Sequence, residues 1–231
     1  MSIKGIILDL DDTLIDSERA YGEALEALNL SASSTDFVTA RETVKNRLPA
    51  EHVSARNRIL YFKCLLETRG DFNATNLLSI MTSYEKSLAT SIERQWRQLC
   101  RESLFANLTS RAALIVVTNE NLRTQAIKIR AMDPDGLYFS KVVCSEEYGA
   151  EKPDRRLYEA ALSRLALKPS ECAVVGNHFE NDIEPALRLG MIAFLSIEFA
   201  KNTPTKIGRP PVCKDVTILD ALDQIEDALH G

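Results

Sequence analysis

Five short apolar runs restrict the possible folds of this 231-residue chain more than any other feature of its sequence. Each run is continuously apolar rather than alternating, which is typical of a strand that is buried on both faces of a sheet. Helical periodicity follows the runs along the chain, so we expect right-handed crossovers and an α/β fold, with a Rossmann-like parallel sheet flanked by helices. The predicted strands are residues 3–8, 113–117, 142–144, 172–176 and 191–195.

Residues 17–101 show a different pattern, with helical periodicity and no run typical of a buried strand. Polar breaks divide this segment into about four helices. An all-helical block inserted after the first strand of an α/β domain predicts a separate helical cap. The expected domains are therefore a core made of residues 1–16 and 102–231 and a cap made of residues 17–101, with hinges near 16–17 and 99–103.

Aromatic side chains in the predicted cap fall at helical spacings. Tyr61, Phe62, Tyr84 and Trp96 all lie in this segment. Such spacing is typical of helices that pack against one another, so we interpret these four residues as the core of the cap rather than as ligand contacts.

The C-terminal half is predicted to contain two further helices and a loop. Leu157, Ala161 and Leu165 fall on one face of an amphipathic helix over residues 155–165. The prolines within residues 203–213 predict a long loop, and residues 218–229 are predicted to form a closing helix.

Charge and hydropathy exclude several kinds of protein. The net charge is −5 and the 28 lysines and arginines are scattered, so we expect no nucleic-acid or anionic-membrane surface. No apolar run approaches the roughly 20 residues that span a bilayer, and the N-terminus lacks the long apolar stretch of a signal peptide. We therefore expect a cytoplasmic protein; no sequence feature indicates its oligomeric state.

The five cysteines and three histidines are isolated from one another. Without a C-x-x-C pair, neither a disulfide framework nor a zinc site is expected. Because the histidines are isolated, neither a histidine-based metal cluster nor a Ser-His-Asp triad is expected. We assign no role to His178.

The strongest chemical signal is the segment IILDLDDT at residues 6–13. A buried strand ends there in three carboxylates, and in open parallel sheets ligands bind beyond the carboxyl ends of the strands. The alternative is an acidic turn or a helix cap, since Asp and Thr are common at such positions. Closely spaced carboxylates repel one another, however, which favours a bound cation over a simple turn.

This segment resembles the D-x-D-x-T signature of the haloacid dehalogenase superfamily, which consists mostly of magnesium-dependent phosphatases. Three further matches follow in the order of the superfamily, each at a strand end or a helix start. They are VVTN at 116–119, EKPD at 151–154 and GNHFEND at 176–182. The resemblance covers the whole chain, with residues 17–101 in the place of the superfamily's helical cap.

The resemblance implies roles for five polar residues. Asp9 would be the nucleophile, whose carboxylate attacks phosphorus to give an aspartyl-phosphate. Asp11, two residues further along an extended backbone, would protonate the leaving-group oxygen and then deprotonate water. Thr118, Asn119 and Lys152 would hold the non-bridging phosphoryl oxygens. An acid at position 11 also argues against dehalogenation, because dehalogenase members carry a non-acidic residue there.

The resemblance also implies Mg²⁺, held by the Asp9 carboxylate, the Asp11 backbone carbonyl, Asn177 and Asp182. Asn177 departs from the pattern, because the superfamily usually has a metal-binding aspartate there. Asparagine keeps a carbonyl oxygen but lacks the charge, so we expect metal affinity to be lower by at least about 10- to 100-fold. Three explanations stay open: weaker but sufficient metal binding, loss of turnover with ligand binding kept, or a substitution made to trap a state.

The sequence therefore predicts a magnesium-dependent phosphomonoester hydrolase that acts on a small phosphorylated metabolite. A closing cap leaves little room for a macromolecule, so a sugar phosphate, phosphoglycolate or a nucleoside monophosphate is the expected kind of substrate. One alternative is a catalytically weakened homologue that binds a ligand or a protein partner, which only Asn177 indicates. The other is a phosphomutase, for which the cap has no separate signature.

Overall fold

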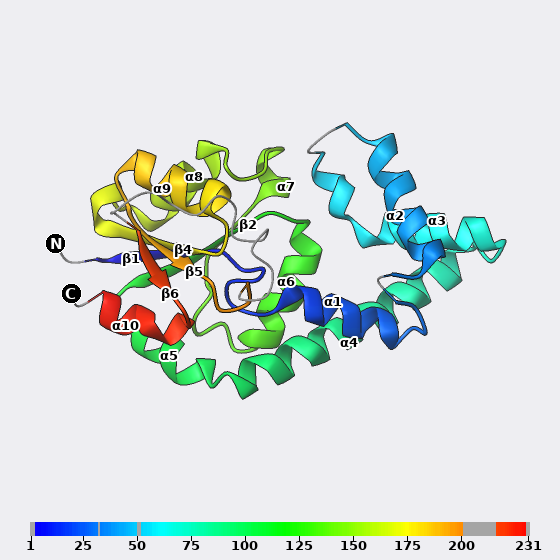
Figure 1. The fold of residues 1–231 in the computed structure, drawn as a ribbon, viewed down its shortest axis with the longest axis horizontal. Coiled ribbons are helices and arrows are strands. Elements are labelled where there is room, and N and C mark those ends of the chain that lie inside the picture. Colours follow the sequence, from blue (N-terminus) through cyan, green and yellow to red (C-terminus); the bar gives the residue numbers. More distant parts are fainter. Residues whose placement is uncertain (1–2, 32, 50–51, 201–215, 230–231) are drawn as a thin grey trace.

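The computed structural model describes residues 3–31, 33–49, 52–200 and 216–229. Their strands form one six-stranded parallel sheet in the order β3-β2-β1-β4-β5-β6 (Figure 1). The strands are β1 (Gly5–Leu8), β2 (Ala113–Thr118), β3 (Val142–Cys144), β4 (Cys172–Gly176), β5 (Ile192–Ser196) and β6 (Thr217–Leu219). The predicted α/β fold is confirmed, and all five predicted strands are present with only their ends shifted.

Strand β1 lies in the middle of the sheet and is buried on both faces. It pairs with β2 on one side and β4 on the other, so that Leu8 lies opposite both Val116 and Val175. The chain adds β2 and β3 on one side of β1 and then crosses to the other side with β4. This reversal of strand order leaves a crevice at the carboxyl ends of the strands, where ligands bind in open α/β sheets.

Helices cover both faces of the sheet (Figure 1). Ile6 belongs to one hydrophobic cluster, with side chains of α5, α6 and α10, and the next residue Ile7 belongs to another, with side chains of α8 and α9. The α-helices described outside residues 17–100 are α5 (Arg101–Thr109), α6 (Leu122–Met132), α7 (Ser145–Tyr148), α8 (Arg155–Leu165), α9 (Glu184–Leu189) and α10 (Ile225–Ala228). A 3₁₀ helix (Pro169–Glu171) and a π-helix (Phe179–Ile183) lie on either side of β4. Both faces of the strands are buried, which explains their unbroken apolar sequences.

Residues 17–101, which we call the helical segment, contain no strand in their described part. Their helices are α1 (Ser17–Glu26), α2 (Thr35–Arg47), a 3₁₀ helix (Val53–Arg56), α3 (Arg58–Arg69) and α4 (Ala74–Gln98). The polar breaks in the sequence are helix ends: the Asn73 side chain accepts a hydrogen bond from the α4 backbone, and α3 ends at Gly70 with φ +75°. In Figure 1, α4 runs from α3 back to α5.

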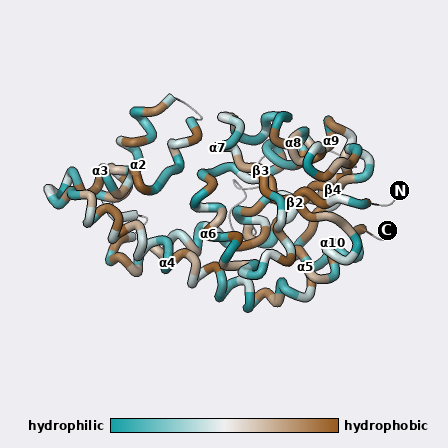
Figure 2. Tube along the Cα trace, turned by 180° about the vertical axis from the view of Figure 1, so that it is seen from behind, coloured by the Kyte–Doolittle hydropathy of each residue, from teal (hydrophilic) through white to brown (hydrophobic). Residues whose placement is uncertain are grey.

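The distribution of hydrophobic residues matches this layered arrangement. Figure 2 shows that the strands are mostly hydrophobic, whereas the helices mix hydrophobic and hydrophilic residues. This mixture is typical of helices with one buried face. Among the helices that the structure describes, none has both the length and the hydrophobicity that crossing a membrane requires.

The aromatic residues of the helical segment pack in two places. The Phe62 ring centroid lies 5.8 Å from that of Phe37 and 5.3 Å from that of Tyr84, so the predicted packing between helices is confirmed. Tyr61 and Tyr84 also line the cavity described below, so they are not core residues alone. Trp96 differs: its ring lies 5.0 Å from that of Phe105 in α5 and contacts no other aromatic ring of the segment among the described residues. Trp96 belongs to the same buried hydrophobic cluster as Phe62 and Tyr84, but its ring packs beside the sheet, where it anchors the end of α4.

We expect Phe105→Ala to lower the free energy of unfolding by about 3–5 kcal/mol, because truncating a buried Phe leaves a cavity. The Phe105 side chain is fully buried and lies beside Trp96. Urea unfolding measures the effect. Phe72→Ala is the matched control. The Phe72 side chain is 43% exposed, so its loss should lower the free energy of unfolding by less than about 1 kcal/mol. Equal losses in the two variants would contradict this account of the core.

The prediction of a closing helix over residues 218–229 is wrong in its first part. Thr217–Leu219 is strand β6, which pairs in parallel with β5 at the edge of the sheet. A 3₁₀ helix (Leu222–Gln224) and α10 follow it. Pairing with β5 overrides the local helical pattern, since three residues are too few to show a strand period. The predicted loop over residues 203–213 lies outside the described residues.

Candidate active site

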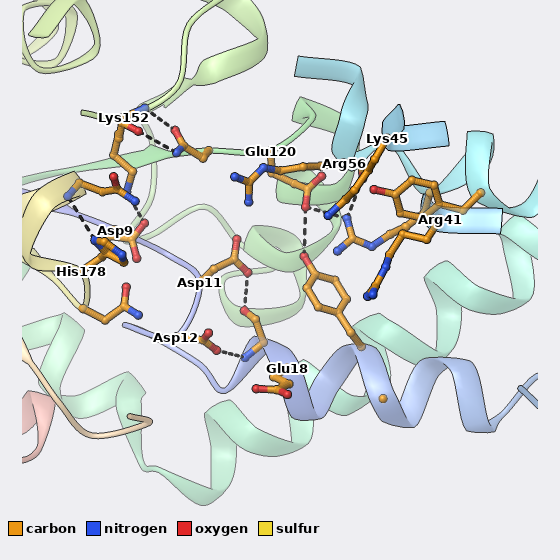
Figure 3. A pocket seen from close by; sticks show the side chains of 18 of the residues that line it. Asp9, Asp11, Asp12, Glu18, Arg41, Lys45, Arg56, Glu120, Lys152 and His178 are labelled. Carbon is orange, nitrogen blue, oxygen red and sulfur yellow. Dashed lines mark hydrogen bonds and ion pairs between the residues drawn. The ribbon is translucent and has the colours of Figure 1, made fainter. Parts of the chain in front are cut away.

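Segments distant in the sequence meet at the carboxyl edge of the sheet. The Lys152 ammonium lies 2.5 Å from Asp9 Oδ1 and 2.6 Å from Asp182 Oδ1 (Figure 3). Asp9 directly follows β1, Asp182 follows β4, and Lys152 precedes α8. The three side chains are almost fully buried at one end of a cavity of about 460 Å³.

Gly176 at the end of β4 allows Asp182 to reach this position. A Cβ atom at residue 176 would lie 2.4 Å from the Cβ atom of Asp182, so only glycine leaves room for the close approach. The His178 backbone N–H donates a 3.0 Å hydrogen bond to Asp182 Oδ2, which fixes the other carboxylate oxygen. A glycine and an acid six residues apart are thus parts of one local structure.

Asp9 is held by Thr13 as well as by Lys152. The Thr13 hydroxyl lies 2.7 Å from Asp9 Oδ2 and 3.4 Å from Asn177 Oδ1. Burial raises the pKa of Asp9, and Asp182 adds to this effect, although the positive charge of Lys152 opposes it. Burial lowers the pKa of Lys152, but its two carboxylate partners outweigh burial and raise it overall. Lys152 therefore stays protonated beside Asp9.

Asp11 makes a different set of contacts from Asp9. Its carboxylate lies 2.5 Å from Lys128 Nζ and 2.8 Å from Gln125 Nε2, and it accepts a hydrogen bond from the Ser17 hydroxyl. Burial alone would raise the pKa of Asp11, but the positive charge of Lys128 and these hydrogen bonds lower it to about 2. Asp11 is therefore ionised at neutral pH. Lys128 is fully buried and also lies 2.5 Å from the Tyr21 hydroxyl.

The two residues after β2 are placed differently with respect to the cavity. Asn119 lines it, and its side-chain oxygen accepts a 2.7 Å hydrogen bond from the Lys152 backbone N–H. Thr118 is fully buried and does not line the cavity; its hydroxyl accepts a 2.7 Å hydrogen bond from Gln125. Asn119 thus positions Lys152, whereas the Thr118 hydroxyl is engaged by α6.

Sequence reasoning missed Gln125 and Lys128, which lie one helical turn apart on α6. A signal for them exists: the buried face of α6 carries polar side chains at Thr124, Gln125 and Lys128, where a helix against a sheet normally carries apolar ones. A buried lysine almost always has a partner, and here the partner is the Asp11 carboxylate.

Ion pairs join the helical segment to the rest of the molecule. They include Arg56–Glu151, Arg58–Glu120 and Arg123–Glu85, with nitrogen–oxygen distances of 2.8, 2.6 and 2.6 Å. The Arg58 guanidinium also lies over the Tyr21 ring, 3.9 Å from its centroid. Sequence spacing did not predict these contacts, because they form between segments that are far apart in the chain.

The predicted metal ligands supply oxygen atoms but only a small negative charge. Within the described residues, no group of three His, Cys, Asp or Glu side chains is placed to hold a metal ion. The reason is local: Asn177 has an amide, and Lys152 lies between Asp9 and Asp182. Asp9 Oδ2 and Asn177 Oδ1 nevertheless lie near the same Thr13 hydroxyl, and oxygen donors of this kind suit Mg²⁺. The donor atoms are therefore of the kind that Mg²⁺ takes, although Asp182 already contacts Lys152 and the His178 backbone N–H.

Comparison with known proteins supports a hydrolytic site. A family model described as haloacid dehalogenase-like hydrolase matches residues 3–190. The human N-acylneuraminate-9-phosphatase is 25% identical over 221 residues, which are 90% of this chain and 88% of the relative. The glyceraldehyde 3-phosphate phosphatase of Methanothermobacter thermautotrophicus is 39% identical over 95 residues, 40% of each chain.

Solved structures share the fold. A 2-haloacid dehalogenase from Pseudomonas syringae superimposes with a TM-score of 0.70 at 22% identity, over 99% of this chain and 98% of that one. A magnesium-bound hydrolase from Bacillus subtilis superimposes with a TM-score of 0.64 at 18% identity, over the whole of both chains. At these identities the likeness concerns the fold alone.

Proposed function

Because this chain belongs to the haloacid dehalogenase-like hydrolases, we propose that it is a magnesium-dependent phosphatase that acts on a small phosphorylated metabolite. The observation that carries the proposal is the Lys152 ammonium within 2.6 Å of both Asp9 and Asp182. This places a cation for phosphoryl oxygens beside a carboxylate that can attack phosphorus. The names of the phosphatase relatives support a phosphate ester as the substrate.

In the proposed first step, an Asp9 carboxylate oxygen forms a bond to phosphorus while the bond between phosphorus and the leaving oxygen breaks. The electron pair of that bond goes to the leaving oxygen, which takes a proton from Asp11. Lys152 and the backbone N–H of Asn119 would hold the non-bridging oxygens. The Thr118 hydroxyl is fully buried and does not line the cavity, so we assign it a smaller contribution to phosphate binding.

In the proposed second step, a water oxygen forms a bond to phosphorus while Asp11 takes its proton. The bond between phosphorus and Asp9 breaks, and its electron pair returns to the Asp9 carboxylate. The contacts with Lys128, Gln125 and Ser17 keep Asp11 ionised, which suits this role as a base. To act as an acid in the first step, Asp11 must first take a proton from solvent as the substrate binds. An approaching phosphate anion raises the pKa of a nearby carboxyl group, which favours this protonation.

Mg²⁺ would be held by Asp9, the Asp11 backbone carbonyl, Asn177 and Asp182. When bound, it neutralises charge on the transferring phosphoryl group. We also propose that the helical segment, residues 17–101, is a cap on a core formed by residues 1–16 and 102–231. Closed over the cavity, such a cap excludes water and contacts the part of the substrate beyond the phosphate.

The proposal is tested by measuring phosphate release from p-nitrophenyl phosphate and from a panel of phosphorylated metabolites. We expect turnover with Mg²⁺ and its loss when EDTA removes the ion. Ligand binding without turnover of any compound would instead support the catalytically weakened homologue that Asn177 indicates.

Asn177→Asp should lower the Mg²⁺ concentration that gives half-maximal activity by at least about 10-fold, because it adds a negative charge at an oxygen ligand. The measurement is a Mg²⁺ titration of activity. Asn181→Asp is the matched control: it adds the same charge to the cavity lining at a residue without a proposed metal contact, and should shift the titration less than about threefold. An unchanged titration in Asn177→Asp would show that residue 177 is not a ligand.

A further inference from the structure

Positive side chains gather at the end of the cavity away from Asp9 and Lys152. Figure 3 shows Arg41, Lys45 and Arg56 together on the side of the helical segment. Arg58 also lines the cavity. The proposed phosphatase chemistry uses none of these four cations, so their presence needs a separate explanation.

Two of the four cations have carboxylate partners. Arg56 forms a two-point contact with Glu151, at 3.0 and 2.8 Å, and Arg58 lies 2.6 Å from Glu120. The positive charges of these two arginines are therefore compensated within the protein.

Neither Arg41 nor Lys45 forms an ion pair with a carboxylate in the described part of the chain, and the negative charge of Glu120, which already pairs with Arg58, acts on Lys45 only from a distance. Arg41 Nε is buried there without a hydrogen-bond partner. Partial burial lowers the pKa of Lys45, and the positive charges of Arg41 and Arg56 lower it further. A buried donor without a partner is costly, and crowded positive charges repel one another, so an anion at this place would relieve both.

The two residues are arranged to act together. Arg41 and Lys45 lie four residues apart on α2, which places them on the same face of the helix. The adjacent strip of α2 carries Phe37, Ala40 and Val44, all buried, and these residues anchor the helix. A planar guanidinium can bind two oxygens of one carboxylate or phosphate, and the lysine adds a point charge beside it.

We infer that Arg41 and Lys45 form a subsite for a second anionic group of the substrate, a carboxylate or a second phosphate, at the end of the cavity opposite Lys152. The inference rests on the proposed function, since it takes the first phosphate to lie at Lys152. It narrows the substrate class to metabolites that carry two anionic groups at opposite ends.

The test compares substrates that differ in one group. 6-Phosphogluconate against glucitol 6-phosphate, both open chains, tests a carboxylate, and fructose 1,6-bisphosphate against fructose 6-phosphate tests a second phosphate. At least one doubly anionic compound should have a kcat/KM roughly 10-fold or more above that of its partner, because a charge-assisted contact is gained. The arm that shows the preference identifies the group.

Arg41→Gln and Lys45→Gln should each raise KM for the preferred doubly anionic compound roughly 10- to 100-fold, with kcat changed less than about threefold. The singly anionic partner should be nearly unaffected. Arg47→Gln is the matched control, since it removes a charge from the exposed surface of the same helix without lining the cavity. Absence of a preference in both arms, or equal losses for both members of a pair, would overturn the inference while phosphatase activity stands.

Direct binding separates this inference from the proposed function. Isothermal titration of the same four compounds into the Asp9→Asn variant does not depend on turnover. Tighter binding of a doubly anionic compound, weakened by adding Arg41→Gln, would support the subsite even if the wild-type chain released no phosphate. Equal affinities within both pairs would overturn the subsite by this route as well.

Discussion

Asp9→Asn should lower the rate of phosphate release by about 10⁴-fold or more, since removing a nucleophile removes the covalent path. The amide cannot form an aspartyl-phosphate, although it keeps an oxygen for the Thr13 hydroxyl. The measurement is the initial rate with p-nitrophenyl phosphate at saturating Mg²⁺. Radiolabelled phosphate in the acid-quenched wild-type protein, and its absence from the variant, would show the intermediate directly.

Asp12→Asn is the matched control for this experiment. It removes the same charge from the same loop, and its amide oxygen can still accept the hydrogen bond from the Ser17 backbone N–H that Asp12 Oδ1 accepts at 3.0 Å. We expect its rate to stay within about threefold of wild type. Comparable losses in both variants would mean that Asp9 acts through charge alone, and full activity in Asp9→Asn would exclude it as the nucleophile.

Lys152→Met should reduce both stability and turnover. Without the ammonium, two buried carboxylates face each other, and breaking a buried ion pair typically costs about 3–5 kcal/mol. We also expect kcat/KM to fall by about 10²–10³-fold, because a donor to the phosphoryl oxygens is lost. Urea unfolding without Mg²⁺ and steady-state kinetics with Mg²⁺ measure the two effects.

The stability loss in Lys152→Met should depend on pH in a defined direction. Burial and mutual repulsion raise the pKa of the two carboxyl groups above their unfolded values once Lys152 is gone. Groups with a raised pKa in the folded state destabilise it increasingly as pH rises, so the loss should be larger at about pH 8 than at about pH 5. The opposite order would contradict the assignment of charge in the cavity.

Lys4→Met is the matched control for Lys152→Met, because it removes a lysine from an exposed ion pair instead of a buried one. Lys4 also forms an ion pair, 2.7 Å from Glu171, but its side chain is 59% exposed. An exposed pair contributes less than about 1 kcal/mol, so this variant should unfold nearly as wild type and keep its activity.

The sequence predicts the sheet well because burial on both faces leaves an unmistakable pattern. Because β1 and β4 are parallel neighbours, their carboxyl ends lie side by side. Asp9 and Asp182, which follow these strands, are therefore expected to lie close together. Strand β6 escapes prediction because it is three residues long and lies at the sheet edge, where only Leu219 is buried. Its formation depends on pairing with β5, which local sequence does not encode.

The side chains that contact the predicted site residues are harder to predict from the sequence. That Asp11 faces Lys128 depends on the rotation of α6 about its own axis, which tertiary packing decides. The same holds for α2, whose weak apolar pattern does not reveal that Arg41 and Lys45 face the cavity. The motifs locate the residues proposed to act on phosphorus. The charged residues proposed to contact the rest of the substrate, Arg41 and Lys45, lie in a segment that has no motif.

The packing of Trp96 against Phe105 limits how the helical segment can move. The C-terminal end of α4 is fixed there, so an opening motion would pivot about that point. A helix of this length spans about 37 Å, and a rotation of about 10° would displace its far end by about 6 Å. Atoms near the pivot would scarcely shift. Such a rotation would widen the cavity beside α2, whereas Asp9, Lys152 and Asp182 lie outside the helical segment and would keep their contacts with one another.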